Sequence, residues 1–204
     1  SIEPNLVTDE IIQIVKKSEN ICNHFHIPLQ SGTDDVLKSM KRRYNTSKYR
    51  NLVHKIKEEI PDCCIGADVI EGFPTETDAN FKETYNFINS LPISYLHVFT
   101  YSERTGTKAS QFDTKISKEV RKDRTNRLRE LSERKKIDFI NEHLNTEHFI
   151  IPEKIIENGE KFMIKGWTEN YIYTTVLADT PTNAVLKVKL NEYENGKVFG
   201  NIVE

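Results

Sequence analysis

The chain has 204 residues, with 29 Lys and Arg against 31 Asp and Glu, and a formal net charge of −2. This balance excludes a strongly basic nucleic-acid binder, and no apolar run approaches the roughly 18 residues that would predict a membrane span. With 37% hydrophobic residues, the composition is typical of a soluble globular protein of one or two domains. The three cysteines are too few, and odd in number, for a secreted disulfide framework, so we expect a cytoplasmic protein.

Helix-like and strand-like patterns alternate through residues 1–145. Apolar residues recur at helical spacing after a capping Thr, Asn or Ser, and short apolar runs end at Gly or Pro. This alternation predicts an α/β fold with a parallel sheet, either doubly wound or barrel-like. The expected strands are Phe25 to Leu29, Cys63 to Ile70 and Tyr95 to Tyr101, and the expected helices follow Thr8, Thr33, Asn45, Thr77 and Ser117.

The pattern changes after about Asn145, and residues 146–204 are expected to form a second, all-β domain. Asn158-Gly159 and Asn195-Gly196 are turn signals between short strand-like runs. Five short strands in so small a domain predict a closed barrel similar in plan to an oligonucleotide-binding (OB) fold. The expected strands are His148 to Ile156, Lys161 to Gly166, Tyr171 to Ala178, Ala184 to Leu190 and Lys197 to Val203.

Several polar residues lie in or just after the expected parallel strands, at the sheet edge where α/β folds bind ligands. Gln30 and Ser31 follow the first strand, Asp68 and Gly72 lie in and after the second, and Arg104 follows the third. Each group also has a structural interpretation: a capped strand-to-helix turn, an aspartate that ties neighbouring strands together, and an exposed arginine.

Two features suit RNA. Lys165, Trp167, Tyr171 and Tyr173 place aromatic rings beside a cation on the small barrel, as base stacking requires, although rings there can also fill the barrel core. The long helix carries a basic stripe that suits a phosphate backbone and equally suits an ordinary solvated face. The stripe comprises Lys115, Lys118, Arg121, Lys122, Arg124, Arg127, Arg129, Arg134, Lys135 and Lys136.

No metal site and no catalytic residue is expected within the chain. Cys63 and Cys64 are adjacent on a strand, so their side chains point to opposite faces and cannot clamp one ion, and Cys22 stands alone. His24 and His26 share a strand face, but no third candidate ligand lies near them in the sequence.

Five motifs in a fixed order carry a family resemblance. They are HIPLQSG at 26–32, MKRRY at 40–44, GADVIEGFPTET at 66–77, YSERTGTKA at 101–109 and GWTENYI at 166–172. Together they resemble the methylthiotransferase family of radical S-adenosylmethionine (SAM) enzymes. The resemblance implies the second half of a parallel (βα) radical SAM barrel followed by a TRAM domain. In the full-length enzyme it also implies SAM and two four-iron four-sulfur clusters, whose cysteines would precede Ser1, so this chain alone should bind no cluster.

The resemblance further implies insertion of a methylthio group at C2 of a modified adenosine in tRNA, with an external electron donor. SIEP at 1–4 resembles the subgroup that acts on N6-threonylcarbamoyladenosine. Gln30, Ser31, Asp68 to Gly72 and Arg104 would line the SAM and substrate side. Glu71 and Thr75 depart from the family, which more often has a small or apolar residue and Gly at these positions. The alternatives are a ribosomal-protein aspartate methylthiotransferase and a non-catalytic RNA-binding protein.

The same resemblance predicts a consequence of truncation. Without the first strands of the barrel, the edge of the strand from Phe25 to Leu29 and the apolar interior faces of the sheet would be bare, so we expect self-association.

Overall fold

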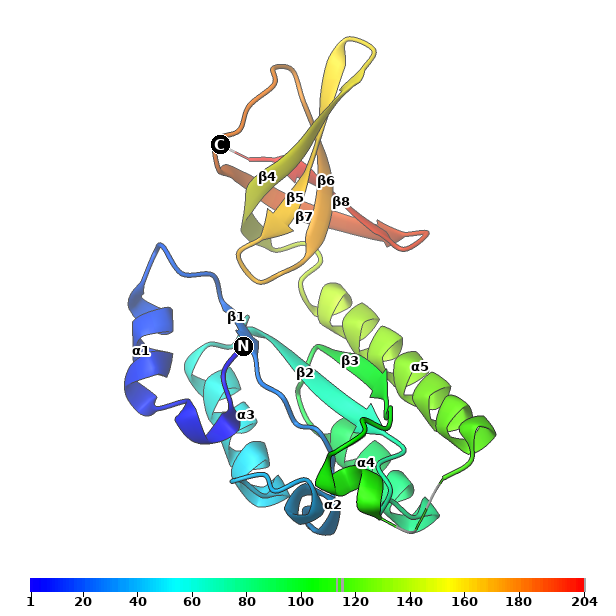
Figure 1. The fold of residues 1–204 in the computed structure, drawn as a ribbon. Helices are drawn as coiled ribbons and strands as arrows, with labels where there is room; N and C mark the ends of the chain where they lie inside the picture. The colour runs from blue at the N-terminus through cyan, green and yellow to red at the C-terminus, as the bar shows by residue number, and fades with distance from the viewer. Residues whose placement is uncertain (113, 115, 204) are drawn as a thin grey trace.

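The computed structural model describes residues 1–112, 114 and 116–203, which form a layered α/β part and a five-stranded barrel (Figure 1). A parallel three-stranded sheet in the order β1–β2–β3 organises the first part. The strands are β1 (His24–His26), β2 (Cys64–Glu71) and β3 (Tyr95–Thr100). The predicted mixed fold with a parallel sheet is therefore confirmed.

The first strand ends at His26, two residues before Pro28, and is shorter than the predicted Phe25 to Leu29. The chain nevertheless continues alongside β2. The N–H groups of Ile27 and Leu29 donate to the carbonyls of Gly66 and Asp68, and Gln30 forms an isolated bridge with Val69. This path carries Gln30 to the carboxyl end of the sheet.

Helices cover one face of the sheet, and most begin at the expected caps. The side chains of Thr8, Asn45, Thr77 and Ser117 each accept a hydrogen bond from a backbone N–H of the following turn. Phe25, Ile65 and Val69 point toward these helices and lie in the main core. The helices are α1 (Asp9–Lys17), α2 (Asp34–Ser39), α3 (Thr46–Glu59), α4 (Asp78–Ser90) and α5 (Lys118–Glu142), with short 3₁₀ segments η1 (Pro4–Leu6) and η2 (Lys108–Gln111).

The opposite face of the sheet, which we call the open face, carries His24, His26, Asp68, Tyr95 and His97. Strand alternation places these side chains on the side away from the core residues of the same strands. The same alternation also places Ile70 and the exposed Phe99 on this face, so the face expected to be apolar carries a mixture of polar, aromatic and aliphatic side chains.

The second part is a closed antiparallel barrel in which one neighbouring pair, β6 and β8, is parallel. Its strand order is β4-β5-β6-β8-β7, and its interior is filled by aliphatic residues such as Ile150, Ile164 and Val188. Helix α5 runs beside β3 and leads into the barrel (Figure 1). The strands are β4 (Glu147–Asn158), β5 (Lys161–Thr168), β6 (Tyr173–Ala178), β7 (Leu186–Glu194) and β8 (Lys197–Ile202).

The two parts pack against each other. Phe139 and Ile140, near the end of α5, and Cys64, at the start of β2, belong to the same hydrophobic cluster as the barrel interior. Within the described residues, no helix combines the length and apolarity needed to cross a membrane.

Candidate functional site

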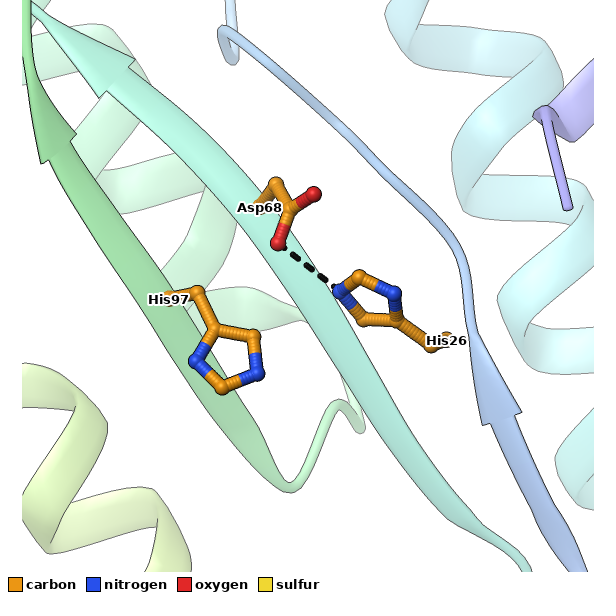
Figure 2. Close-up of side chains that lie close together, drawn as sticks. All are labelled: His26, Asp68 and His97. Carbon is orange, nitrogen blue, oxygen red and sulfur yellow. Dashed lines mark hydrogen bonds and ion pairs between the residues drawn. The ribbon is translucent and has the colours of Figure 1, made fainter. Parts of the chain in front are cut away.

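Three side chains from three adjacent strands converge on the open face: His26 from β1, Asp68 from β2 and His97 from β3 (Figure 2). The Nε2 atom of His26 lies 2.8 Å from Oδ1 of Asp68, and the rings of His26 and His97 meet edge to face with centroids 5.4 Å apart. Candidate ligand atoms of all three lie within 4.8 Å of one another.

Parallel register explains why residues so distant in sequence meet here. Asp68 and His97 are direct partners in the β2–β3 ladder, while His26 pairs with Gly66, two residues before Asp68 on the same face. Asp68 is therefore paired, as a half-buried carboxylate should be. The sequence pattern identified Asp68 and the shared face of His24 and His26, but it missed His97. The alternation of Tyr95 and His97 along β3 indicates that they share a face. The sequence does not show which residues of β2 they pair with, so it could not place His97 beside Asp68.

A column of stacked rings runs from the open face to the barrel. The His24 ring lies 4.0 Å from the Tyr171 ring at an interplanar angle of 2°, and Tyr171 stacks on Trp167 at 4.4 Å and 15°. The Tyr95 hydroxyl is 2.9 Å from Nε2 of His24. His24 therefore contributes to the contact between the two parts of the protein and does not join His26 as a metal ligand.

A cleft of about 600 Å³ lies between the open face and the barrel. Lys165, Trp167, Tyr171 and Tyr173, all predicted to contact RNA, line its barrel side, and Tyr95 and His97 line the opposite side. The Tyr171 ring already stacks on both His24 and Trp167, so it takes part in the contact between the sheet and the barrel. Trp167 and Tyr173 are half-buried neighbours with centroids 4.9 Å apart, and they remain the aromatic surface of the cleft.

The residues predicted for the SAM side lie in different surroundings. Gln30 is buried at the carboxyl end of the sheet with a φ of 69°, and no group among the described residues donates a hydrogen bond to its side-chain oxygen Oε1. Ser31 is buried under α4, where its hydroxyl lies 3.5 Å from those of Thr33 and Thr84. The guanidinium of Arg104 is exposed on a loop after β3. Ser31 therefore fits the structural interpretation, in which it belongs to a strand-to-helix turn. The side-chain oxygen of Gln30 can still accept a hydrogen bond from a ligand.

Gly72 and Glu71 form part of a buried charge cluster beneath α5. Gly72 has a φ of 80°, and a Cβ there would lie 2.5 Å from Cγ of Arg121, so the close approach requires glycine. Glu71 is fully buried, and burial, reinforced by the nearby Glu76 carboxylate, raises its pKa to about 9. Glu76 itself is paired with Arg124 and accepts from the Gly72 N–H. Glu71 thus faces the helices and not the cleft.

The predicted basic stripe on α5 divides into structural and exposed residues. Arg121 and Arg124 are buried, and they pair with Glu103 and with Glu76 respectively. Arg134 donates to the Tyr85 hydroxyl and Lys135 to two backbone carbonyls. The stripe is therefore not one solvated surface for a phosphate backbone. Lys115 lies outside the described residues. Lys118, Lys122 and Arg129 line a separate cleft of about 390 Å³ with the end of β3.

The cysteines do not fit an iron–sulfur cluster. Cys63 and Cys64 belong to different hydrophobic clusters, as their adjacent positions predicted, and burial raises the pKa of each thiol to about 12. Cys22 is exposed in the loop before β1. Because ligation needs converging thiolates, these three residues cannot supply a cluster site.

Comparison with known proteins first gives a class. Residues 1–88 match the Radical SAM superfamily. The fold is also shared with the solved structure of the archaeal Methanocaldococcus infernus Elp3 with an N-terminal deletion. That match has a TM-score of 0.50 and 12% identity, and it covers 94% of this chain and 56% of that one.

Particular relatives are similar along the chain. Threonylcarbamoyladenosine tRNA methylthiotransferase MtaB of Bacillus subtilis is 41% identical across 100% of this chain and 46% of its own length. MtaB of Aquifex aeolicus is 39% identical over 80% of this chain and 38% of its own. The tRNA-2-methylthio-N(6)-dimethylallyladenosine synthase of Symbiobacterium thermophilum is 33% identical over 98% of this chain and 43% of its own. The chain thus spans less than half the length of these relatives, and the similarities support the radical SAM tRNA methylthiotransferase resemblance.

Proposed function

We propose that this chain is the C-terminal part of a radical SAM tRNA methylthiotransferase, which inserts a methylthio group at C2 of N6-threonylcarbamoyladenosine. The observation that carries the proposal is similarity at 41% identity along the whole chain, through both the sheet and the barrel, to a relative named for that nucleoside. The relative named for the dimethylallyl nucleoside is 33% identical over nearly the same span. The cytoplasm is the compartment in which such an enzyme would meet tRNA.

In this proposal, the sheet supplies part of a SAM pocket. Gln30 supports the assignment because its buried oxygen has no hydrogen-bond donor within the part of the chain that the structure describes, and an amino or hydroxyl group of SAM could donate to it. SAM bound with a reduced cluster supplies the radical chemistry, and the protein supplies position and electrostatics. No step involving a cluster is assigned to this chain, because its cysteines do not fit one. The external electron donor remains part of the proposal for the whole enzyme.

The barrel is proposed as the tRNA-docking TRAM domain, with an OB-like plan. Its closed five-stranded order supports this assignment, as does the placement of Lys165, Trp167 and Tyr173 on the cleft that faces the sheet. An RNA segment held by these residues would lie beside the open face. A stacked base contributes roughly 1–3 kcal/mol, and a lysine–phosphate contact adds a salt-dependent component.

Nucleoside analysis of tRNA from cells lacking the parent gene tests the reaction. Loss of the 2-methylthio form of N6-threonylcarbamoyladenosine, with accumulation of the unmethylthiolated nucleoside, is expected. Loss of methylthio on the isopentenyl nucleoside instead, or on neither, would contradict the proposed substrate. Expression of the intact parent gene should restore the modification.

Binding of an anticodon stem–loop to the chain tests the docking surface separately. Trp167→Ala should weaken binding about tenfold or more, and Lys165→Ala should also reduce the slope of log affinity against log salt by about 1. Lys187→Ala is the matched control, because Lys187 pairs with Glu147 on β4 and does not line the cleft. Equal losses for Lys165→Ala and Lys187→Ala would show that general charge, not this cleft, binds RNA.

A further inference from the structure

The geometry points to a binding site for one divalent first-row transition-metal ion at His26, Asp68 and His97 on the open face. Nothing in the proposed function requires this ion, and the site uses no cysteine. The residues offer two imidazole nitrogens and a carboxylate oxygen, a donor set that suits zinc or iron better than magnesium or calcium. Figure 2 shows the two rings and the carboxylate turned toward one another.

The spacing is compatible with a shared ion. Metal–ligand bonds of about 2.0–2.2 Å place two ligand atoms of the same ion roughly 3–4.4 Å apart. The candidate atoms lie within 4.8 Å of one another, and His26 Nε2 and Asp68 Oδ1 are already 2.8 Å apart. His97 is exposed, so its ring can rotate by the small amount needed without displacing core residues.

The three side chains also have unused bonding capacity. The His26–Asp68 contact is the one hydrogen bond among them. Among the residues that the structure describes, neither ring nitrogen of His97 has a hydrogen-bond partner, nor does Oδ2 of Asp68 or Nδ1 of His26. A structural ion pair would explain the contact between His26 and Asp68 but would make no use of the ring nitrogens of His97, which register places beside Asp68.

The position of the site indicates what kind of site it is. Three protein donors leave at least one coordination position open, and His97 lines the cleft of about 600 Å³. An ion held here would therefore present its open position to that cleft. Such an arrangement is typical of sites that bind a further ligand, and structural zinc sites are usually closed by a fourth protein donor.

The test uses the complete 204-residue chain without an affinity tag, stripped with a chelator and carrying Cys22→Ser to remove the exposed thiol. Calorimetric titration with Zn²⁺ should show one saturable equivalent. The variants His97→Ala and Asp68→Asn should each weaken binding at least tenfold, with unchanged far-ultraviolet circular dichroism. His54→Ala removes an exposed histidine of α3, and this control should bind as the parent does.

A second measurement needs no altered site residue. On addition of Zn²⁺, the imidazole NMR signals of His26 and His97 should shift, while those of His54 and His143 should not. Absence of a saturable equivalent would overturn the proposal, as would equal affinity in the His97→Ala and Asp68→Asn variants. Shifts confined to other histidines would also overturn it and would indicate adventitious binding only.

Discussion

The imidazole of His24 and the ring of Tyr171 lie face to face, with centroids 4.0 Å apart and planes within 2° of parallel. This contact joins β1 to the turn between β5 and β6, and so joins the sheet to the barrel. Tyr171 has a φ of 67°, in the left-handed region that a bulky residue seldom adopts, at a cost of roughly 1–3 kcal/mol. We infer that stacking on His24 and Trp167 offsets this backbone strain.

Mild acid should loosen this stack. Burial, with smaller contributions from His26, the chain N-terminus and His97, lowers the pKa of His24 to about 4 from its usual 6.5. The unfolded chain therefore binds more protons between these values, and stability is lost as pH falls through this window. Trp167, the single tryptophan, should report the change as a fluorescence step between about pH 6.5 and 4.

The control for this step is His24→Gln, which cannot titrate. The step should be absent in that variant and present in His54→Ala. A fluorescence step that is unchanged in His24→Gln would show that another group controls the contact between sheet and barrel.

Replacement of Glu71 by Gln should stabilise the fold at neutral and alkaline pH. The folded chain holds a proton on Glu71 that the unfolded chain releases above about pH 4.5, so wild-type stability should fall between pH 4.5 and about 9. Gln carries no such penalty, and its amide can donate to Glu76. We expect a gain of about 1–3 kcal/mol at pH 8 and little gain at pH 4, measured by denaturant unfolding.

Glu76→Gln is the matched comparison. It removes the carboxylate that pairs with Arg124 and accepts from Gly72, so it should destabilise the chain at every pH at which Glu76 is ionised. Stabilisation by Glu76→Gln, or destabilisation by Glu71→Gln at pH 8, would contradict this arrangement.

Anaerobic reconstitution of the chain with iron and sulfide should yield no cluster. Cys63 and Cys64 are buried with strongly raised thiol pKa values, and Cys22 is exposed in the loop before β1. Analysis of both iron and acid-labile sulfide is needed, because the proposed metal site could retain iron alone. Four iron and four sulfide per chain, with the matching visible absorption, would refute the prediction.

The chain should self-associate through the outer edge of β1. Among the described residues, β1 has a strand neighbour on one side, and on its outer side the N–H of Ile2 donates to the carbonyl of His26. The polar open face offers less drive for association than the apolar face expected from the sequence. Sedimentation velocity over a range of concentrations should show a reversible, concentration-dependent increase in mass. A monomer at all concentrations would exclude this association.

Local chemistry made most of the fold predictable from the sequence. Thr8, Asn45 and Thr77 predict the starts of their helices, because a side-chain cap bonds to backbone groups only a few residues away. Asn195-Gly196 predicts its hairpin for the same reason, because the turn depends on these two residues alone. The end of β1 was less predictable, because pairing beyond Pro28 depends on a strand about 40 residues away.

The candidate site was harder to predict from the sequence than the fold, because it depends on strand register and on burial. His97 joins His26 only after two parallel ladders are aligned. Arg121 and Arg124 look like surface cations in the sequence, and only the packing of α5 on the sheet shows that they are buried partners of acidic residues. The stacking of Tyr171 on His24 and Trp167 likewise could not be predicted from the sequence, because it depends on how the barrel packs against the sheet.

Helix α5 acts as a spacer of fixed length and phase between the sheet and the barrel. Its 25 residues, at about 1.5 Å of rise each, span roughly 37 Å, and each residue turns the chain by about 100°. One residue inserted after Ser132, whose hydroxyl bonds the backbone of Leu96, would therefore swing the barrel about the helix axis and carry Tyr171 away from His24. The same insertion in the turn after β4 would leave that alignment intact, so the contact between sheet and barrel tolerates a longer barrel loop better than a longer helix.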